Sequence, residues 1–137
     1  MYFCIVKITL RTAGDRINTA TTSMRTNTDF SKRMHEIMST AWQICRTTGE
    51  SFAVCLHRSW QCYKLRSAML TRIVRFTYIK KSTGELRNAL GTLDRSRYHY
   101  EAVGGRDYKP ADCIRYWDTE AQGFRMFKNF NLVSAEI

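Results

Sequence analysis

The chain has 137 residues, of which 44% are hydrophobic and 12% aromatic, so it can build a packed core and is not globally disordered. Lys and Arg outnumber Asp and Glu by 22 to 12, and the net charge of +10 favours polyanionic partners, which release counterions on binding. No apolar stretch reaches the roughly 18 residues of a membrane span, and Lys7 interrupts the only candidate signal peptide. We therefore expect a cytoplasmic protein without a membrane partner.

Residues 1–29 form the first of three segments. Residues 2–10 are apolar and rich in β-formers, which predicts an edge strand. Residues 11–28 are rich in Thr, Asn and Arg, and we expect a loosely ordered tail there.

Residues 30–72 predict a helical hairpin. Asp29 is the expected N-cap of the first helix, whose apolar residues recur at three- and four-residue steps up to Cys45. Gly49 suits the left-handed position that ends a helix, and Ser51 is the expected cap of the second helix. The short link makes the two helices antiparallel. We expect the core between them to be aromatic, built from Trp42, Phe52, Trp60 and Tyr63.

Residues 73–137 change to the period of β-strands. Residues 73–80 alternate, residues 81–84 form a tight turn ending in Gly84, and residues 85–93 return as the partner strand. A long loop over residues 94–110 precedes strands at 113–118, 124–128 and 131–137. Five short strands in so few residues predict a small antiparallel barrel. The predicted fold class is α+β, with an N-terminal helical hairpin followed by an SH3-like β-barrel.

The barrel resembles SH3-type β-barrel proteins of unknown function from Bacteroides-type bacteria, their mobile elements and phages. Residues 74–87, 89–92, 114–120 and 123–128 carry this resemblance, and residues 41–60 are similar to a helical hairpin found beside such barrels. The second strand pair also resembles WYL-type domains, the ligand-binding barrels of bacterial regulators, with Tyr116, Trp117, Arg125 and Phe127 in the matching places. The leading Trp-Tyr-Leu triplet of that family is absent. These resemblances imply a fold and leave the function open.

Catalytic and metal-binding patterns are missing from the sequence. The three histidines, His35, His57 and His99, fall in three different predicted elements, and the five cysteines include no C-x-x-C pair. There is no Gly-rich phosphate loop. We therefore expect a protein that is not an enzyme, holds no metal or cofactor, and keeps its thiols reduced.

The long loop alternates cations with aromatic residues, as proteins that bind single-stranded nucleic acid do. The alternative is that its tyrosines pack the loop onto the barrel while the arginines face water. The predicted nucleic-acid-binding residues are Arg95, Arg97, Tyr98, His99, Tyr100, Arg106, Tyr108, Lys109, Arg115, Tyr116, Arg125 and Lys128. The hairpin contains seven Lys and Arg residues and only two acidic residues. We therefore expect Arg58, Lys64, Arg66 and Arg72 to contact the phosphate backbone of the nucleic acid.

Three functions are consistent with these patterns. The first is a nucleic-acid-binding accessory protein of a phage or mobile element, with single strands favoured. The second is a protein–protein module that binds and inhibits a host or defence enzyme. The third is a WYL-like sensor of a nucleotide or oligonucleotide, with a ligand pocket near Tyr116, Arg125 and Lys128. Salt separates the first two, because polyanion binding weakens steeply with ionic strength.

Overall fold

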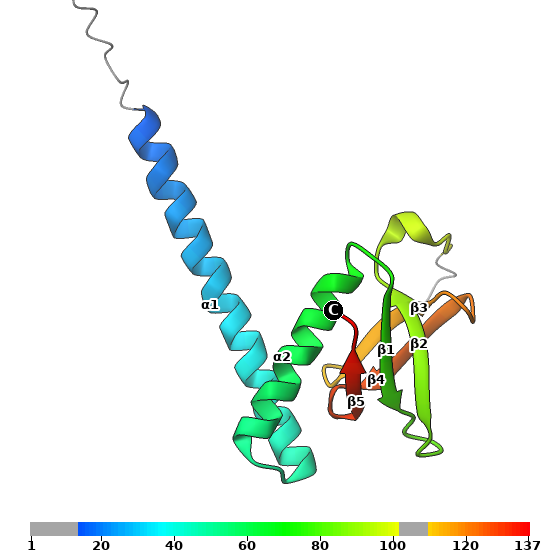
Figure 1. The fold of residues 1–137 in the computed structure, drawn as a ribbon. Coiled ribbons are helices and arrows are strands. Elements are labelled where there is room, and N and C mark those ends of the chain that lie inside the picture. The colour runs from blue at the N-terminus through cyan, green and yellow to red at the C-terminus, as the bar shows by residue number, and fades with distance from the viewer. Residues whose placement is uncertain (1–13, 102–109) are drawn as a thin grey trace, which may run out of the picture. The chain divides into compact units, whose positions relative to one another are not determined.

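A computed structural model describes residues 14–101 and 110–137, with side chains from residue 28 onward (Figure 1). The elements are α1 (Gly14–Thr48), α2 (Phe52–Met69), β1 (Val74–Ile79), β2 (Leu86–Thr92), η1 (Arg95–Arg97), β3 (Cys113–Asp118), β4 (Gly123–Lys128), η2 (Asn129–Asn131) and β5 (Leu132–Ala135). Contacts divide the chain into two units, Met1–His35 and Glu36–Ile137, and the second contains the sheet. Two helices followed by a five-stranded antiparallel sheet confirm the predicted α+β class.

The start of the first helix differs from the prediction. Helix α1 begins at Gly14, so Asp29 is not its N-cap and the polar stretch after Gly14 is helical. This stretch contains many residues of modest helix propensity, but neither Gly nor Pro interrupts the chain between Asp15 and Thr48. The strand predicted over residues 2–10 lies outside the described residues.

The hairpin between the helices is as predicted. Gly49 has a φ of +72° and its N–H donates to the Cys45 carbonyl at 2.9 Å, which ends α1 in the left-handed conformation that glycine tolerates. Ser51 occupies the N-cap position of α2, although its side chain makes no capping hydrogen bond.

The core between the helices consists of aliphatic and small side chains rather than aromatic ones, which corrects our expectation. Ile37, Ala41 and Ile44 of α1 are buried, as are Cys55 and Ser59 of α2. The Ser59 hydroxyl donates to the Ile37 carbonyl at 2.7 Å, a contact that requires the two backbones to lie close together. Large rings do not fit into so narrow a space. Trp42 therefore lies at the edge, 51% exposed, with its ring 4.6 Å from that of Phe52.

A second buried face of α2 covers the sheet. Cys62, Leu65 and Met69 belong to one hydrophobic cluster with residues of all five strands. At the C-terminal end of α2, the Met69 carbonyl accepts hydrogen bonds from the Leu93 N–H at 2.7 Å and from the Thr92 hydroxyl at 3.1 Å. The helix is thus packed against the sheet and bonded to the end of β2.

The sheet has the strand order β4-β3-β2-β1-β5. β1 pairs with β2 through the predicted turn, where Gly84 has a φ of +73°. β1 also pairs with β5, for example Phe76 with Ala135, so the last strand joins the first (Figure 1). In the hydrophobic core that the sheet encloses with α2, the rings of Phe76, Tyr78, Tyr116 and Phe127 contact one another.

Gly91 of β2 lies directly against two of these rings. A Cβ atom at this position would lie 2.5 Å from Cδ2 of Tyr116 and 2.9 Å from Cε1 of Phe76. Both rings are buried and cannot move aside freely. We expect Gly91→Ala to destabilise the protein by about 2 kcal/mol, the usual cost of overpacking a core, as measured by the midpoint of urea unfolding.

Gly123→Ala is the matched control, because its nearest neighbour would be the Ala121 carbonyl at 3.8 Å. This variant should unfold within about 0.5 kcal/mol of the wild type. Equal midpoints for the two variants would show that the rings around Gly91 repack.

Candidate nucleic-acid interface

A cavity of about 550 Å³ opens beside β4 and the β1–β2 turn. Its size falls in the range of small-molecule sites, which hold a ligand by apolar walls and a few polar groups. Tyr78, Phe124, Met126 and Phe127 supply much of the apolar wall. Five cationic side chains line the same cavity: Lys80, Lys81, Arg87, Arg125 and Lys128. No carboxylate is among the described lining residues.

Lys128 is held in place by a carboxylate outside the lining. Its ammonium group donates a hydrogen bond to Asp112, which precedes β3. The hydrogen bond from Lys128 lowers the pKa of Asp112, and the same bond raises the pKa of Lys128. Both groups are therefore charged at neutral pH.

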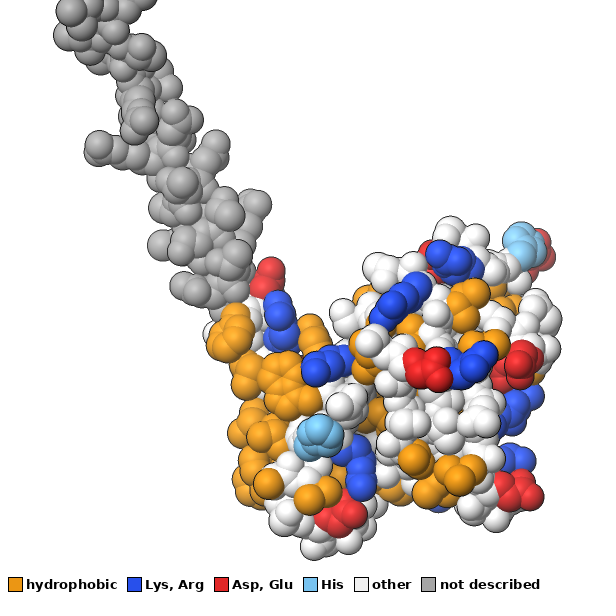
Figure 2. All heavy atoms as spheres, in the orientation of Figure 1, with side chains coloured by type: hydrophobic (Ala, Val, Ile, Leu, Met, Phe, Trp, Pro, Cys, Tyr) orange, Lys and Arg blue, Asp and Glu red, His pale blue; other side chains and the backbone are white. Residues whose placement is uncertain are grey.

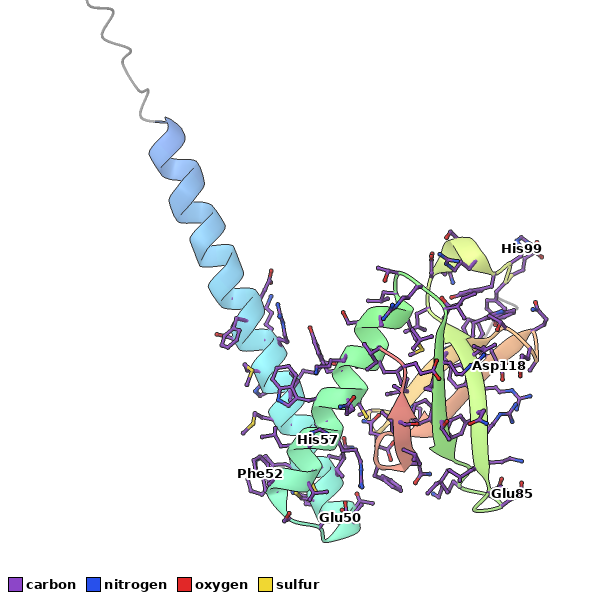
Figure 3. The ribbon with its side chains drawn as sticks, viewed as in Figure 1. Glu50, Phe52, His57, Glu85, His99 and Asp118 are labelled. Atoms are coloured by element: carbon purple, nitrogen blue, oxygen red, sulfur yellow. The ribbon has the colours of Figure 1, made fainter. Side chains whose placement is uncertain are left out.

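Arg87 and Arg125 share a second carboxylate. Asp118 ends β3 with its side chain buried, and Figure 3 labels it within the sheet. Its Oδ2 accepts a hydrogen bond from Nη2 of Arg87 at 3.3 Å and lies 3.1 Å from Nε of Arg125. Its Oδ1 accepts from the N–H groups of Glu120 and Ala121, at 3.0 and 3.1 Å. One carboxylate thus fixes two cations of the cavity and the β3–β4 turn.

An aromatic cluster lies where the loop after β2 meets β3 and β4. Tyr98 stacks on Trp117, with ring centroids 4.7 Å apart and planes 8° apart. Tyr100 meets the Phe124 ring edge-on at 4.9 Å. The Arg115 guanidinium lies 4.2 Å above Phe124. This arrangement supports the alternative reading of the loop, in which its tyrosines pack against the barrel.

Of the other loop residues predicted to bind nucleic acid, three are described by the structure and three are not. Arg95 and His99 are exposed, and Arg97 forms an ion pair with Asp94 at 3.0 Å. His99 Nε2 lies 3.6 Å from Glu101 Oε1. Arg106, Tyr108 and Lys109 lie outside the described residues. The described structure therefore brings Arg125 and Lys128 together at the cavity and keeps the described loop cations elsewhere.

Tyr116 requires a correction. We predicted that its ring contacts nucleic acid, but it has no exposed surface and lies in the core. Its hydroxyl is 3.1 Å from that of Tyr78, and burial together with this hydrogen bond raises its pKa. The ring supports the cavity wall from behind and cannot stack on a base.

The helix cations are only partly available for phosphate contacts. Arg58 pairs with Glu50 and Arg66 with Glu36, each at 2.7 Å, whereas Lys64 and Arg72 are exposed. Pairs at the surface are weak enough to exchange partners. Figure 2 shows acidic and basic side chains interspersed over the face in view, whereas the charged residues described in the cavity lining are all cationic.

Sequence reasoning missed Lys80, Lys81 and Arg87. Lys80 precedes the predicted turn, Lys81 is its first residue, and Arg87 is the register partner of Tyr78, so the hairpin pattern already placed them at one end of the sheet. Lysines in turns are common on protein surfaces, so there was no reason in the sequence to assign a role to these two. Their common cavity with Arg125 becomes visible only when β4 is in place.

Other chemistry finds little support among the described residues. They contain no group of three or more His, Cys, Asp or Glu side chains able to hold a metal ion. Burial raises the pKa of the Cys62 thiol to about 12, and a hydrogen bond with Cys55 raises that of Cys45 to about 11, so both are protonated and weakly reactive at neutral pH. Within the same residues, neither helix is long and apolar enough to cross a membrane.

Comparison with known proteins identifies the barrel. The model of the family described as WYL_2, Sm-like SH3 beta-barrel fold, matches residues 62–133. The match begins within α2 and ends in β5, so it includes the helix face that packs on the sheet and every lining residue of the cavity. No curated protein and no solved structure matches the chain.

The pair of Asp112 and Lys128 predicts how stability depends on pH. Because folding lowers the pKa of Asp112, its contribution is present at pH 7 and is lost as the pH falls below the usual Asp range of about 4. We expect the free energy of unfolding to fall less for Asp112→Asn than for the wild type between pH 5 and about pH 2.5. The difference should be at most about 1 kcal/mol, because the ion pair is partly exposed.

Urea unfolding at each pH measures this difference. Lys128→Gln removes the same pair from the other side and should flatten the acid dependence equally. A Lys128→Gln profile as steep as that of the wild type would contradict the assignment.

Proposed function

Because the chain belongs to the WYL_2 family of Sm-like SH3 β-barrels, we propose that it is a non-enzymatic nucleic-acid-binding protein. A nucleotide or a short single strand would bind in the cavity beside β4. This proposal combines our first and third predicted functions, with the site moved from the loop to the cavity. The origin in a phage or mobile element stays a prediction.

The observation that carries the proposal is the composition of the cavity. Five cations line it without a described carboxylate among them, and Met126 and Phe127 lie between Arg125 and Lys128 along β4. Nucleotides combine an anionic phosphate with an apolar, flat base, and proteins bind single strands with the same combination of positive charge and aromatic surface. A volume of about 550 Å³ suits a ligand of nucleotide size.

The non-enzymatic part of the proposal rests on the same lining. Hydrolysis or transfer needs a general base, most often an imidazole or a carboxylate within reach of the substrate. The described lining offers neither group. Its cations supply charge and hydrogen-bond donors, which suffice for binding.

The protein–protein alternative has its own support in the exposed apolar side chains of the hairpin. Trp42 and Val54 are about half exposed, and Figure 2 shows apolar side chains gathered over the helices. Such a surface can bind another protein. Binding of a protein through this apolar surface would depend little on salt concentration. The salt titration described below therefore separates the two functions.

Fluorescence anisotropy with labelled single-stranded and duplex DNA and RNA tests the proposal at ~50 and ~200 mM salt. We expect single strands to bind most tightly and affinity to fall steeply with salt. Lys81→Gln/Arg125→Gln removes two cations of the cavity, so it should weaken binding at least tenfold. For a single strand it should also lower the slope of log K against log salt by about 1.4, which is two phosphate contacts.

Two variants control for net charge. Arg46→Gln/Arg75→Gln removes the same charge from exposed positions outside the cavity, and Arg95→Gln/Arg97→Gln removes it from the loop. Both should bind nearly as the wild type does. A larger loss in the loop variant would return the site to the loop, and the absence of binding by the wild type at ~50 mM salt would disprove the proposed function.

A further inference from the structure

Asp118 lies behind the wall of the cavity and is not part of its lining. Its side chain is 2% exposed, whereas those of its partners Arg87 and Arg125 are 28% and 38% exposed. A buried carboxylate is stable only when charge partners and hydrogen bonds replace its hydration. Both guanidinium groups and two backbone N–H groups supply that replacement here.

The shared carboxylate fixes the distance between the two arginines. Both approach the same oxygen, Oδ2, from strands β2 and β4, which are not neighbours in the sheet. Their guanidinium groups are therefore held together although their like charges repel. Arg125 approaches through Nε, which leaves its two Nη groups, and Arg87 approaches through Nη2, which leaves Nη1 and Nε. Each group keeps N–H donors for a ligand in the cavity.

We propose that Asp118 is a positioning residue and that Arg87 and Arg125 together bind one terminal phosphate group of the ligand. The inference rests on the proposed function and makes it more specific, since it selects a nucleotide or a strand with a phosphorylated end. Asp118 acts through the two arginines and does not touch the ligand itself.

The chemistry of the pair favours a terminal phosphate over a phosphodiester. A terminal phosphate carries nearly two negative charges at pH 7 and three oxygens that accept hydrogen bonds, so it can bind two guanidinium groups at once. A phosphodiester within a strand carries one charge and has two free oxygens. Arginine binds phosphate through its planar fork, and lysine cannot reproduce that geometry.

The sign of one mutational effect tests the positioning role. Asp118→Asn removes a negative charge from behind a cationic cavity, so electrostatics alone would strengthen anion binding. Loss of positioning would instead weaken the binding of a terminal phosphate. We expect the wild type to prefer a 5′-phosphorylated thymidine pentamer to the unphosphorylated pentamer about tenfold, as charged hydrogen bonds imply, and Asp118→Asn to lose this preference.

Matched variants keep the test valid if Asp118→Asn does not fold. Arg87→Lys and Arg125→Lys keep the charge and lose the fork, so each should reduce the preference for the phosphorylated pentamer while the unphosphorylated pentamer binds as before. Arg75→Lys and Glu120→Gln change exposed side chains outside the cavity lining and should preserve the preference. An undiminished preference in both cavity lysine variants, or in folded Asp118→Asn, would overturn the inference.

Failure of the proposed function gives a different result. If neither pentamer binds, titration with inorganic phosphate, followed by the NMR signals of the arginine Nε–H groups, tests the pair directly. Shifts of the Arg87 and Arg125 signals in the wild type, together with an unshifted Arg87 signal in Arg125→Lys, would support the phosphate site without the nucleic acid. No shift in the wild type would overturn it.

Discussion

The buried carboxylate of Asp118 is the constraint on which the cavity end of the sheet depends. A charge in this position is costly unless every lone pair has a partner, and the partners come from β2, β4 and the turn after β3. The same residue is paired in register with Gly91, against which the rings of Tyr116 and Phe76 pack. Aromatic packing at Gly91 and charge pairing at Asp118 therefore act on the same pair of strands, β2 and β3.

Helix α2 links the two parts of the second unit, because it is buried on two faces. One face packs against α1 through small residues, and the other completes the hydrophobic cluster of the sheet. The family match begins at Cys62, where the second of these faces begins. The helix is therefore a structural part of the barrel, which a division of the chain into hairpin and barrel by sequence pattern does not show.

Local patterns in the sequence predicted the fold well. Alternation and Gly84 located β1 and β2, and Gly49 located the end of α1. The site was harder, because its geometry depends on contacts between residues far apart in the chain. Arg87 and Asp118 are 31 positions apart, and no periodicity reports their pairing.

Tyr116 shows a second limit of sequence patterns. β3 has an aromatic residue on each face and is largely buried on both, so alternation could not tell which of its aromatic residues points into the core. The same ambiguity affected the helices. Trp42 has the spacing of a core residue, but the two backbones approach closely at Ser59, and the buried positions between the helices hold aliphatic and small side chains.

The pairing of β1 with β5 has a consequence for synthesis in the cell. Tyr78 has its partner in Leu132, so β1 stays without one neighbour until the last strand has left the ribosome. The helices and the β1–β2 hairpin can form early because their contacts are local, whereas closure of the sheet requires contacts between distant residues. Until then the nascent chain presents an unpaired strand edge, the kind of surface that chaperones protect from aggregation.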